Sequence, residues 1–242
     1  MVDFPETADI ETASEDYARR FSGAVGAWFL NIQTAATLKM LADYPCASVL
    51  DVGGGHGQIA GALADHEYQV TVLGSTESCS ARIQDLITAR RVTFQVGNVL
   101  DIPYPDQHFD VVISYRLLPH VTQWEPFLAE LTRVARQTVV LDYPEVQSIN
   151  YIAPYLFRFK KQLEGNTRTY TCFKQADLLR VFQQHGFTYA DVYKEFFFPM
   201  VLHRKLQTPG VSSVLETGSR ALRLTSLLGS PVILKVVREN PK

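Results

Sequence analysis

The chain has few cysteines and no pattern that would make them structural. Cys46, Cys79 and Cys172 stand far apart, form no Cys-x-x-Cys pair and have no matching pair of histidines nearby. These absences argue against a disulfide-stabilised scaffold and against a structural zinc or other metal site. They also indicate a reducing compartment.

A strong excess of either charge is absent as well. The formal net charge of −2 over 242 residues gives no general attraction to nucleic acid or to an anionic membrane. The first twenty residues are acid-rich, unlike a signal or transit peptide. An uncharged run over 21–38 approaches the length of a membrane span, but polar residues and glycines dilute it. We therefore expect a cytoplasmic protein without stable membrane insertion and without a nucleic-acid partner.

The most informative stretch is Ala47-Ser-Val-Leu-Asp-Val-Gly-Gly-Gly-His-Gly-Gln-Ile-Ala60. A β-rich run ends in an acid and breaks into glycines, and a helical pattern follows. Glycines allow positive φ angles and a close approach of the backbone to a ligand, and the amides at a helix start supply donors. The stretch therefore predicts a nucleotide site with two alternatives. Read from Gly55 it fits a dinucleotide pattern, and read from Asp51 it is Asp-x-Gly-x-Gly-x-Gly.

Hydrophobic spacing predicts an alternation of strands and helices along the rest of the chain. Residues 1–14 carry no periodic pattern and are expected to be loose. Thr122 to Glu125 form a capping-box pattern at the start of a helix. The remaining expected elements are a helix over 14–41, strands over 68–73, 92–96, 109–114, 138–143, 189–198 and 231–238, and helices over 78–90 and 173–185.

This alternation predicts an α/β fold with a doubly wound, mostly parallel sheet and helices on both faces. We expect one domain over 1–242, with a helical cap (1–45) and a cofactor-binding core (46–145). Two stretches, 146–171 and 199–229, are too long for simple connections. We interpret them as insertions that form a lid over the face where the strands end, which is where ligands bind in such sheets.

Two motifs together resemble the class I S-adenosylmethionine-dependent methyltransferases, particularly their small-molecule branch. The first is the glycine turn read from Asp51. The second is Gly97-Asn-Val-x-x-Ile-Pro-Tyr-Pro-Asp-x-x-Phe-Asp-Val-Val112, which is long and specific. The resemblance implies a Rossmann-like, seven-stranded sheet whose last strand is antiparallel, and S-adenosylmethionine as the cofactor.

The resemblance also implies cofactor-binding residues. Asp51 would lie near the cofactor ammonium, where a carboxylate makes a charge-assisted hydrogen bond. Its alternative is a structural acid of the turn. The other positions implied or expected to contact the cofactor are Gly53, Gly55, Gly57, Val99, Ser114 and Tyr115.

Two positions depart from the family pattern. The acid that ends the second strand and binds the ribose hydroxyls falls at Gly74, so Ser75, Thr76 or Glu77 would have to substitute for it. Glu77 can equally be a solvated acid of a first helical turn. Asn98 stands where the family often has an aspartate facing adenine, and its amide oxygen can still accept that hydrogen bond.

Candidates for chemistry follow the fourth strand. His120 has the pKa range of a general base, and Tyr115 lies nearby; either could instead be structural. Arg116 could pair an acidic substrate or be a surface charge. In the insertions, we hypothesise a basic amphipathic lid and a basic rim that would suit an anionic or amphipathic small-molecule acceptor. The residues involved are Ile149, Ile152, Leu156, Arg158, Phe159, Lys160, Lys161 and Leu163, then His203, Arg204, Lys205, Arg220 and Arg223.

The leading hypothesis is methyl transfer from S-adenosylmethionine to a small molecule, with an oxygen atom as the favoured acceptor. A cofactor-binding or regulatory protein of the same fold that transfers no methyl group is the alternative, and the missing acid at Gly74 motivates it. A nicotinamide-dependent oxidoreductase is disfavoured because no Tyr-x-x-x-Lys pair is evident. The acceptor atom and the oligomeric state stay open.

Overall fold

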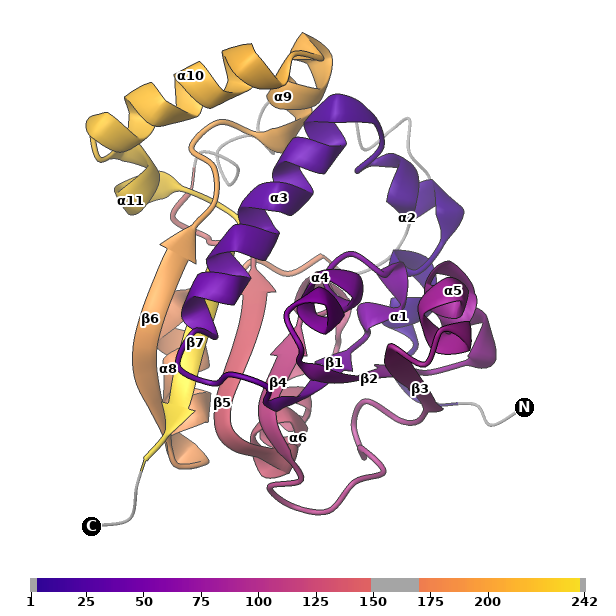
Figure 1. The fold of residues 1–242 in the computed structure, drawn as a ribbon. Coiled ribbons are helices and arrows are strands. Elements are labelled where there is room, and N and C mark those ends of the chain that lie inside the picture. The colour runs from indigo at the N-terminus through magenta and orange to yellow at the C-terminus, as the bar shows by residue number, and fades with distance from the viewer. Residues whose placement is uncertain (1–3, 149–169, 240–242) are drawn as a thin grey trace.

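Seven strands form one twisted sheet in the order β3-β2-β1-β4-β5-β7-β6 (Figure 1). The computed structural model describes residues 4–148 and 170–239. β7 runs antiparallel to β5 and β6, and the other neighbouring strands are parallel. The strands are β1 (Ser48–Val52), β2 (Gln69–Gly74), β3 (Val92–Val96), β4 (Phe109–Ser114), β5 (Ala135–Tyr143), β6 (Phe187–Lys194) and β7 (Val232–Arg238). The predicted doubly wound sheet with an antiparallel last strand is confirmed.

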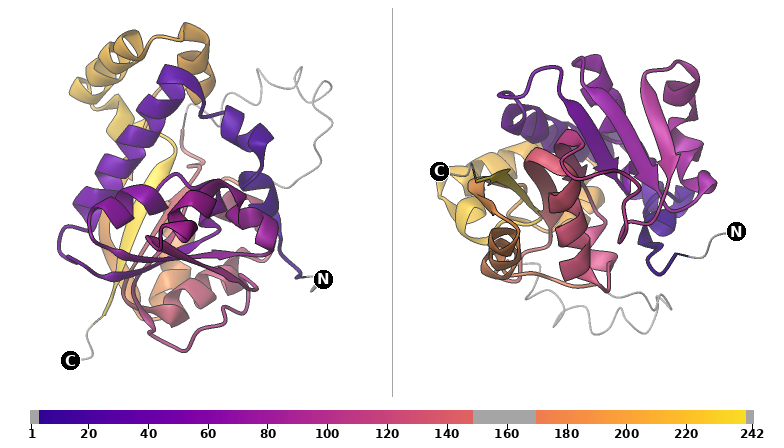
Figure 2. Two further views of the ribbon diagram at one scale, coloured as in Figure 1. Left: turned by 45° about the vertical axis from the view of Figure 1, so that its right-hand side comes forward. Right: turned by 90° about the horizontal axis from the view of Figure 1, so that it is seen from below.

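Both faces of the sheet are buried, which explains the continuous apolar runs of its central strands. Successive residues point to opposite faces: Leu50 and Val112 belong to one apolar core, Val49 and Val111 to the other. Helices α6 (Trp124–Val134) and α8 (Gln175–Gln184) cover the first face. Helices α3 (Gly23–Met40), α4 (Ala60–Asp65) and α5 (Gln84–Thr88) lie over the second (Figure 2).

The helical cap differs from the single helix expected over 14–41. It is divided into α2 (Glu15–Arg19) and α3, and Ser14 caps α2 by accepting the amide of Tyr17. Gly23 takes a φ of +70° at the break. A second difference concerns β6, which ends at Lys194 because Phe196 leaves the sheet to pack against Phe29 of α3.

The expectation that residues 1–14 are loose is wrong for the described part. Residues Ala8–Thr12 form helix α1, in which Asp9 and Thr12 are buried. The capping box is also wrong, because no side chain within α6 caps that helix. Glu6 takes this role instead: its Oε1 accepts the amides of Thr122 at 2.8 Å and Gln123 at 3.1 Å. A carboxylate from 116 residues away thus satisfies donors that the local pattern was expected to satisfy.

Residues 200–228 fold into three helices at the end of the sheet to which β4 and β5 point (Figure 1). They are α9 (Met200–Leu206), α10 (Pro209–Ala221) and α11 (Leu224–Leu228). Glu216 of α10 accepts the amides of Phe197 and Phe198 and is hydrogen-bonded to His203 Nε2 at 2.9 Å. His203 is therefore buried and is not part of a basic rim, and Arg220 is bound to the backbone carbonyls of Lys194 and Glu195.

Within the described residues, no helix combines the length and apolar character needed to cross a membrane.

The Glu216 network predicts the stability of this helical unit. Replacing Glu216 with Ala leaves two partly buried amides and the buried His203 ring without their hydrogen-bond partner, so we expect the free energy of unfolding to fall by about 3 kcal/mol. Urea unfolding followed by circular dichroism measures it. The control is Thr217→Ala, an exposed change on the same helix that should be close to neutral. Equal stability of the two variants would contradict the role given to Glu216.

Candidate active site

The glycine turn is built as a strand, a 3₁₀ turn and a helix. β1 ends at Val52, η1 (Gly54–His56) follows, and α4 begins at Ala60. Gly53 and Gly57 have φ angles of +78° and +68°, which residues with a Cβ rarely adopt. At Gly55 the constraint is space, because a Cβ there would lie 2.2 Å from the carbonyl oxygen of Cys79. The turn is thus held against η2 (Glu77–Ile83) by direct backbone contact.

Asp51 lies beneath this turn, and no described residue offers a partner for its charge. It is fully buried, and both carboxylate oxygens lack a hydrogen-bond donor. Burial raises the pKa of Asp51 to about 7. A carboxylate in this state is suited to an incoming cation, since an ammonium group would restore its charged form. The orphaned oxygens and the glycine cradle therefore fit the cofactor that the resemblance implies.

The other predicted cofactor positions lie around the same edge, in different surroundings. Ser114 ends β4 and donates from Oγ to the carbonyl of Val52 at 2.9 Å. Asn98 is half-buried, and its Oδ1 already accepts the amide of Leu100 at 3.0 Å. Val99 is buried in the core. Glu77 is exposed at the start of η2.

Tyr115 is not among the residues that line the cavity described below. Its side chain is fully buried, and its hydroxyl is hydrogen-bonded to Thr37 Oγ1 of α3 at 2.6 Å. Burial raises the pKa of Tyr115 well above its usual value. The hydroxyl therefore joins α3 to the end of β4, and nothing in its position supports a catalytic role.

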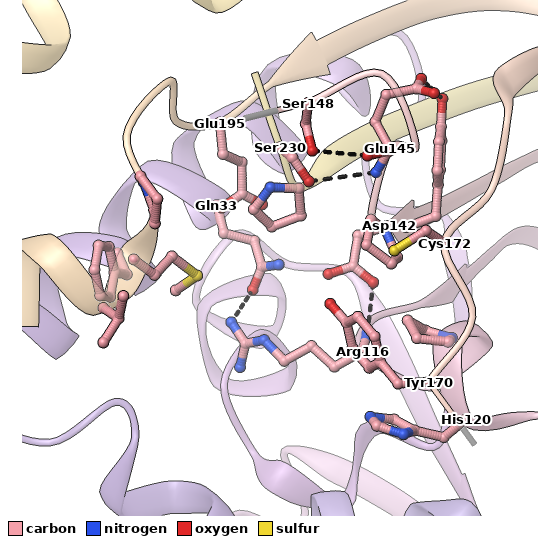
Figure 3. A pocket seen from close by; sticks show the side chains of 18 of the residues that line it. Gln33, Arg116, His120, Asp142, Glu145, Ser148, Tyr170, Cys172, Glu195 and Ser230 are labelled. Atoms are coloured by element: carbon pink, nitrogen blue, oxygen red, sulfur yellow. Dashed lines mark hydrogen bonds between the residues drawn. The ribbon is translucent and has the colours of Figure 1, made fainter. Parts of the chain in front are cut away.

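A cavity of about 1050 Å³ opens beyond the carboxyl ends of β4 and β5 (Figure 3). Aromatic residues from four different parts of the chain form much of its wall. The lining residues are Tyr17, Phe21, Phe29, Gln33, Arg116, Pro119, His120, Asp142, Tyr143, Pro144, Glu145, Val146, Ser148, Tyr170, Thr171, Cys172, Glu195, Pro199, Met200, Val201, Arg204, Ser230 and Pro231. His120 and Arg116 are thus at the cavity as the sequence pattern favours.

Three buried carboxyl groups face this cavity. Asp142 and Glu145 follow one another closely at the end of β5, and Glu195 follows β6. Burial raises the pKa of Asp142 to about 6, against the opposing effect of Arg116. Burial also raises the pKa of Glu195 to about 8, and Glu195 Oε1 has no hydrogen-bond partner. The wall therefore holds acidic groups that a cationic ligand would stabilise in their charged form.

Arg116 organises the polar side of the cavity. Its backbone takes a left-handed φ of +62° and its amide donates to Asp142 Oδ1 at 2.5 Å. The guanidinium lies 3.8 Å from the centre of the Phe21 ring, and Nη2 donates to Gln33 Oε1 at 2.7 Å (Figure 3). Nη1 is buried without a partner. Arg116 is therefore a fixed cation with one free donor, which can hold a carboxylate of the cofactor or of a substrate.

His120 is the last residue of η3 (Leu118–His120), and its ring packs edge-on against Tyr170 with centroids 5.6 Å apart. Of the proposed basic rim, Arg204 lines the cavity. The amphipathic lid predicted from Ile149 to Leu163 lies outside the described residues.

The sequence patterns missed Gln33, Asp142, Glu145 and Glu195 as site residues. For Asp142 a signal existed, because an acid near the end of a parallel strand lies at the edge where ligands bind. Gln33 and Glu195 carry no such signal. They reach the cavity through the packing of α3 and through the departure of the chain from β6.

Comparison with known proteins supports the class that fold and site define. Residues 50–141 match the family model described as a methyltransferase domain. The chain is 28% identical over 219 residues to norajmaline N-methyltransferase of Rauvolfia serpentina, with 78% of this chain and 73% of that enzyme covered. It is 27% identical over 195 residues to an O-methyltransferase, cnsE, of Penicillium expansum, covering 74% of this chain and 66% of that enzyme.

Some other relatives match this chain over a short stretch only, and one such match covers 16% of the length of the related enzyme. Among solved structures, magnesium protoporphyrin IX methyltransferase from Synechocystis PCC 6803 with bound SAH is similar, with a TM-score of 0.65. It shares 16% identity, and the match covers 92% of this chain and 93% of that chain. The likeness at that identity concerns the fold.

The sheet order, the glycine turn and the orphaned Asp51 define a Rossmann-like methyltransferase. The chain is a class I S-adenosylmethionine-dependent methyltransferase, and its cofactor is S-adenosylmethionine.

The backbone contact at Gly55 predicts a loss of cofactor binding in Gly55→Ala. The new methyl group would meet a backbone carbonyl that cannot rotate away, so the turn must move. We expect affinity for S-adenosylhomocysteine, measured by titration calorimetry, to fall by about tenfold or more. Gly61→Ala in α4 is the matched control, because its Cβ would make an ordinary 3.5 Å contact with Leu86. Unchanged affinity in Gly55→Ala would show that the turn is not the cofactor cradle.

Glu195 predicts how stability depends on pH without ligand. Burial raises the pKa of Glu195 in the folded state from its ordinary value of 4.5 to about 8, so the folded protein holds a proton that the unfolded chain releases, and this stabilisation is lost progressively as pH rises from 4.5 through 8. Between pH 6.5 and 8.5 we expect this group to lower the free energy of unfolding by roughly 2 kcal/mol. Glu195→Gln should flatten the decline of melting temperature over that range.

The measurement stays above pH 6.5 because His56 changes the stability in the opposite direction at lower pH. Its pKa is lowered to about 3 by burial, so its contribution grows as pH rises toward 6.5 and is complete above it. Glu77→Gln, an exposed change, serves as the control and should follow the unmodified protein. A decline of equal steepness in Glu195→Gln would contradict the raised pKa.

Proposed function

We propose that the chain transfers a methyl group from S-adenosylmethionine to a basic amine carried on an apolar, partly aromatic small molecule. The observation that carries the proposal is the convergence of Asp142, Glu145 and Glu195 on one aromatic-lined cavity. The expected anionic acceptor would have to lie beside these groups. An ammonium group would instead relieve the cost of their burial.

The balance of charge in the cavity favours this acceptor. The three carboxyl groups share the cavity with two arginines, Arg116 and Arg204. Arg116 already donates its backbone amide to Asp142 and one guanidinium nitrogen to Gln33. Within the described residues Glu195 Oε1 has no hydrogen-bond partner, and Arg116, Arg220 and Gln33 offset only part of the cost of burying this carboxyl group, so a cationic ligand would stabilise its charged form. Tyr17, Phe21 and Tyr170 offer faces against which a cation or an aromatic ring can pack.

The chemistry asks the protein mainly for positioning and for proton transfer. When bound, the cofactor supplies an electrophilic methyl group on a sulfonium, and the acceptor nitrogen must present a lone pair to it. An amine that enters as an ammonium ion must first lose a proton. Asp142, whose pKa is raised to about 6, is ionised near neutral pH and can take that proton at a carboxylate oxygen. Glu195, whose pKa is raised to about 8, holds its own proton at neutral pH and becomes a carboxylate only when a cation lies beside it.

Oxygen methylation, which the sequence favours, is the second candidate. His120 lines the cavity and is of the residue type that accepts a hydroxyl proton near neutral pH. The relative from Penicillium expansum is named an O-methyltransferase and the one from Rauvolfia serpentina an N-methyltransferase, so the relatives support both. The cofactor-binding protein without methyl transfer is the third reading, motivated by Gly74.

Several broader expectations from the sequence stand as part of this proposal. They are one domain over 1–242 with cap, core and lid, a cytoplasmic location, and a small acceptor in place of nucleic acid.

Matched acceptors test the proposal. Pairs that differ only in the accepting group, such as 2-phenylethylamine and 2-phenylethanol, are incubated with S-adenosylmethionine, and methylated product is detected by mass spectrometry. We expect product from amines. In Glu195→Gln the KM for an amine should rise by about tenfold, because a buried charge partner is lost, while the KM of a neutral acceptor changes less than about twofold.

The outcomes separate the three readings. Product from alcohols or phenols alone would overturn the amine and support oxygen, and His120→Ala should then abolish it. Binding of S-adenosylhomocysteine with no product from either set would favour the protein that transfers no methyl group.

A further inference from the structure

The segment before the helical cap lies across the edge of the sheet where the glycine turn stands. Helix α1 packs against η1 and η2, beside the ends of β1 and β2 (Figure 1). Two buried carboxylates fix it. Glu6 accepts the two amides directly before α6, which follows β4, and Asp9 accepts the amide of Ser75, which follows β2. Because β2 and β4 flank β1, residues 6–9 span the strand that carries the turn.

Asp9 is the better placed of these carboxylates to meet a ligand at the end of β2. Its side chain is 1% exposed. Oδ2 accepts the amide of Ser75 at 2.6 Å and the thiol of Cys79 at 3.3 Å, and Oδ1 accepts the hydroxyl of Ser75 at 2.6 Å. A carboxylate offers about four lone-pair positions, and three are used here. One position on Oδ1 and the acceptor lone pairs of Ser75 Oγ remain.

The neighbouring residue explains why an acid from elsewhere is needed. Gly74 ends β2, and a Cβ at this position would lie 2.8 Å from Cys79 Cβ and 3.0 Å from the Phe94 ring. A side chain at 74 therefore requires the surrounding residues to shift. Glu77, the acid nearest in sequence, is exposed on the first residue of η2. Asp9 reaches the same strand end from α1 and is already held there by the backbone.

We propose that Asp9, together with Ser75, receives the ribose hydroxyls of S-adenosylmethionine in place of an acid on β2. A diol presents two O–H donors. Asp9 Oδ1 has a lone-pair position for one, and Ser75 Oγ, whose own proton goes to Asp9, can accept the other. The hydrogen bond to Asp9 is charge-assisted, so it is the stronger of the two. Asp9 is in this view a cofactor-binding residue.

The proposal gives Gly74 a different meaning from that of a lost function. The acid is moved to a segment that Glu6 anchors at the start of α6. Loss of the Glu6 anchor should weaken binding of every cofactor analogue alike, because the whole segment loosens. Loss of the Asp9 carboxylate should weaken binding only of ligands that carry the ribose hydroxyls.

The test is a binding cycle measured by titration calorimetry, with no turnover required. The probes are S-adenosylhomocysteine and its 2′-deoxy and 3′-deoxy ribose analogues, and the proteins are the unmodified chain, Asp9→Asn, Ser75→Ala and the control Asp16→Asn. Asp16 lies on α2 with its side chain 90% exposed. We expect Asp9→Asn to lower affinity for S-adenosylhomocysteine by about 10- to 100-fold while leaving at least one deoxy analogue nearly unchanged. Asp16→Asn should behave like the unmodified chain.

Three results would overturn the proposal. Asp9→Asn could weaken all three probes equally, which is the behaviour of a structural clamp. It could strengthen binding, which is the behaviour of a plug that the cofactor must displace. The unmodified chain could bind the deoxy analogues as well as S-adenosylhomocysteine, a result that needs no variant to fold. Absence of any S-adenosylhomocysteine binding to the unmodified chain would instead contradict the cofactor itself, and circular dichroism of each variant shows that it is folded.

Discussion

The close contact between the backbone of Gly55 and the carbonyl of Cys79 is the constraint on which the site depends. It brings the turn after β1 against the 3₁₀ segment after β2, so that two strand ends share one wall. That approach leaves Asp51 enclosed without a donor, and it leaves no room for a side chain at Gly74. The glycines at 55 and 74 thus have the same cause: a Cβ at either position would collide with Cys79. The departure from the family pattern at Gly74 follows from this packing.

Buried carboxyl groups with too little opposite charge around them are the second feature of this edge of the sheet. Asp51, Asp142 and Glu195 are all buried, and burial raises the pKa of each. Among the described residues, Arg116 lowers the pKa of Asp142 and Glu195, and Arg220 lowers that of Glu195, but these effects do not outweigh burial. Removing charged groups from water costs free energy unless an opposite charge arrives. The folded protein therefore favours binding of a cation at two places, one beneath the glycine turn and one in the cavity.

How far the sequence could predict this arrangement depends on the range of each interaction. The sheet, the glycine turn and the position of His120 follow from local patterns, because strand alternation and turn chemistry act over a few residues. The roles of Glu6 and Asp9 could not follow, since their partners stand 116 and 66 residues away. The capping-box prediction was wrong for the same reason. Thr122 and Glu125 have the right spacing, but the carboxylate of Glu6, which is distant in sequence, accepts the amide of Thr122. His203 looked like part of a basic surface run, and only the packing of α10 shows its burial against Glu216.

Because Glu6 and Asp9 bind residues much later in the chain, their contacts also determine when this part of the fold can form during synthesis. Residues 6–9 leave the ribosome before Ser75 and well before Thr122, so the Asp9 carboxylate stays hydrated until Ser75 has been made and the Glu6 carboxylate until Thr122 has been made. Contacts of such sequence separation form late because loop closure opposes them. The wall around the glycine turn is therefore completed only after β4 and the start of α6 have been synthesised, and a nascent chain that stops before that point carries the turn without the segment that covers it.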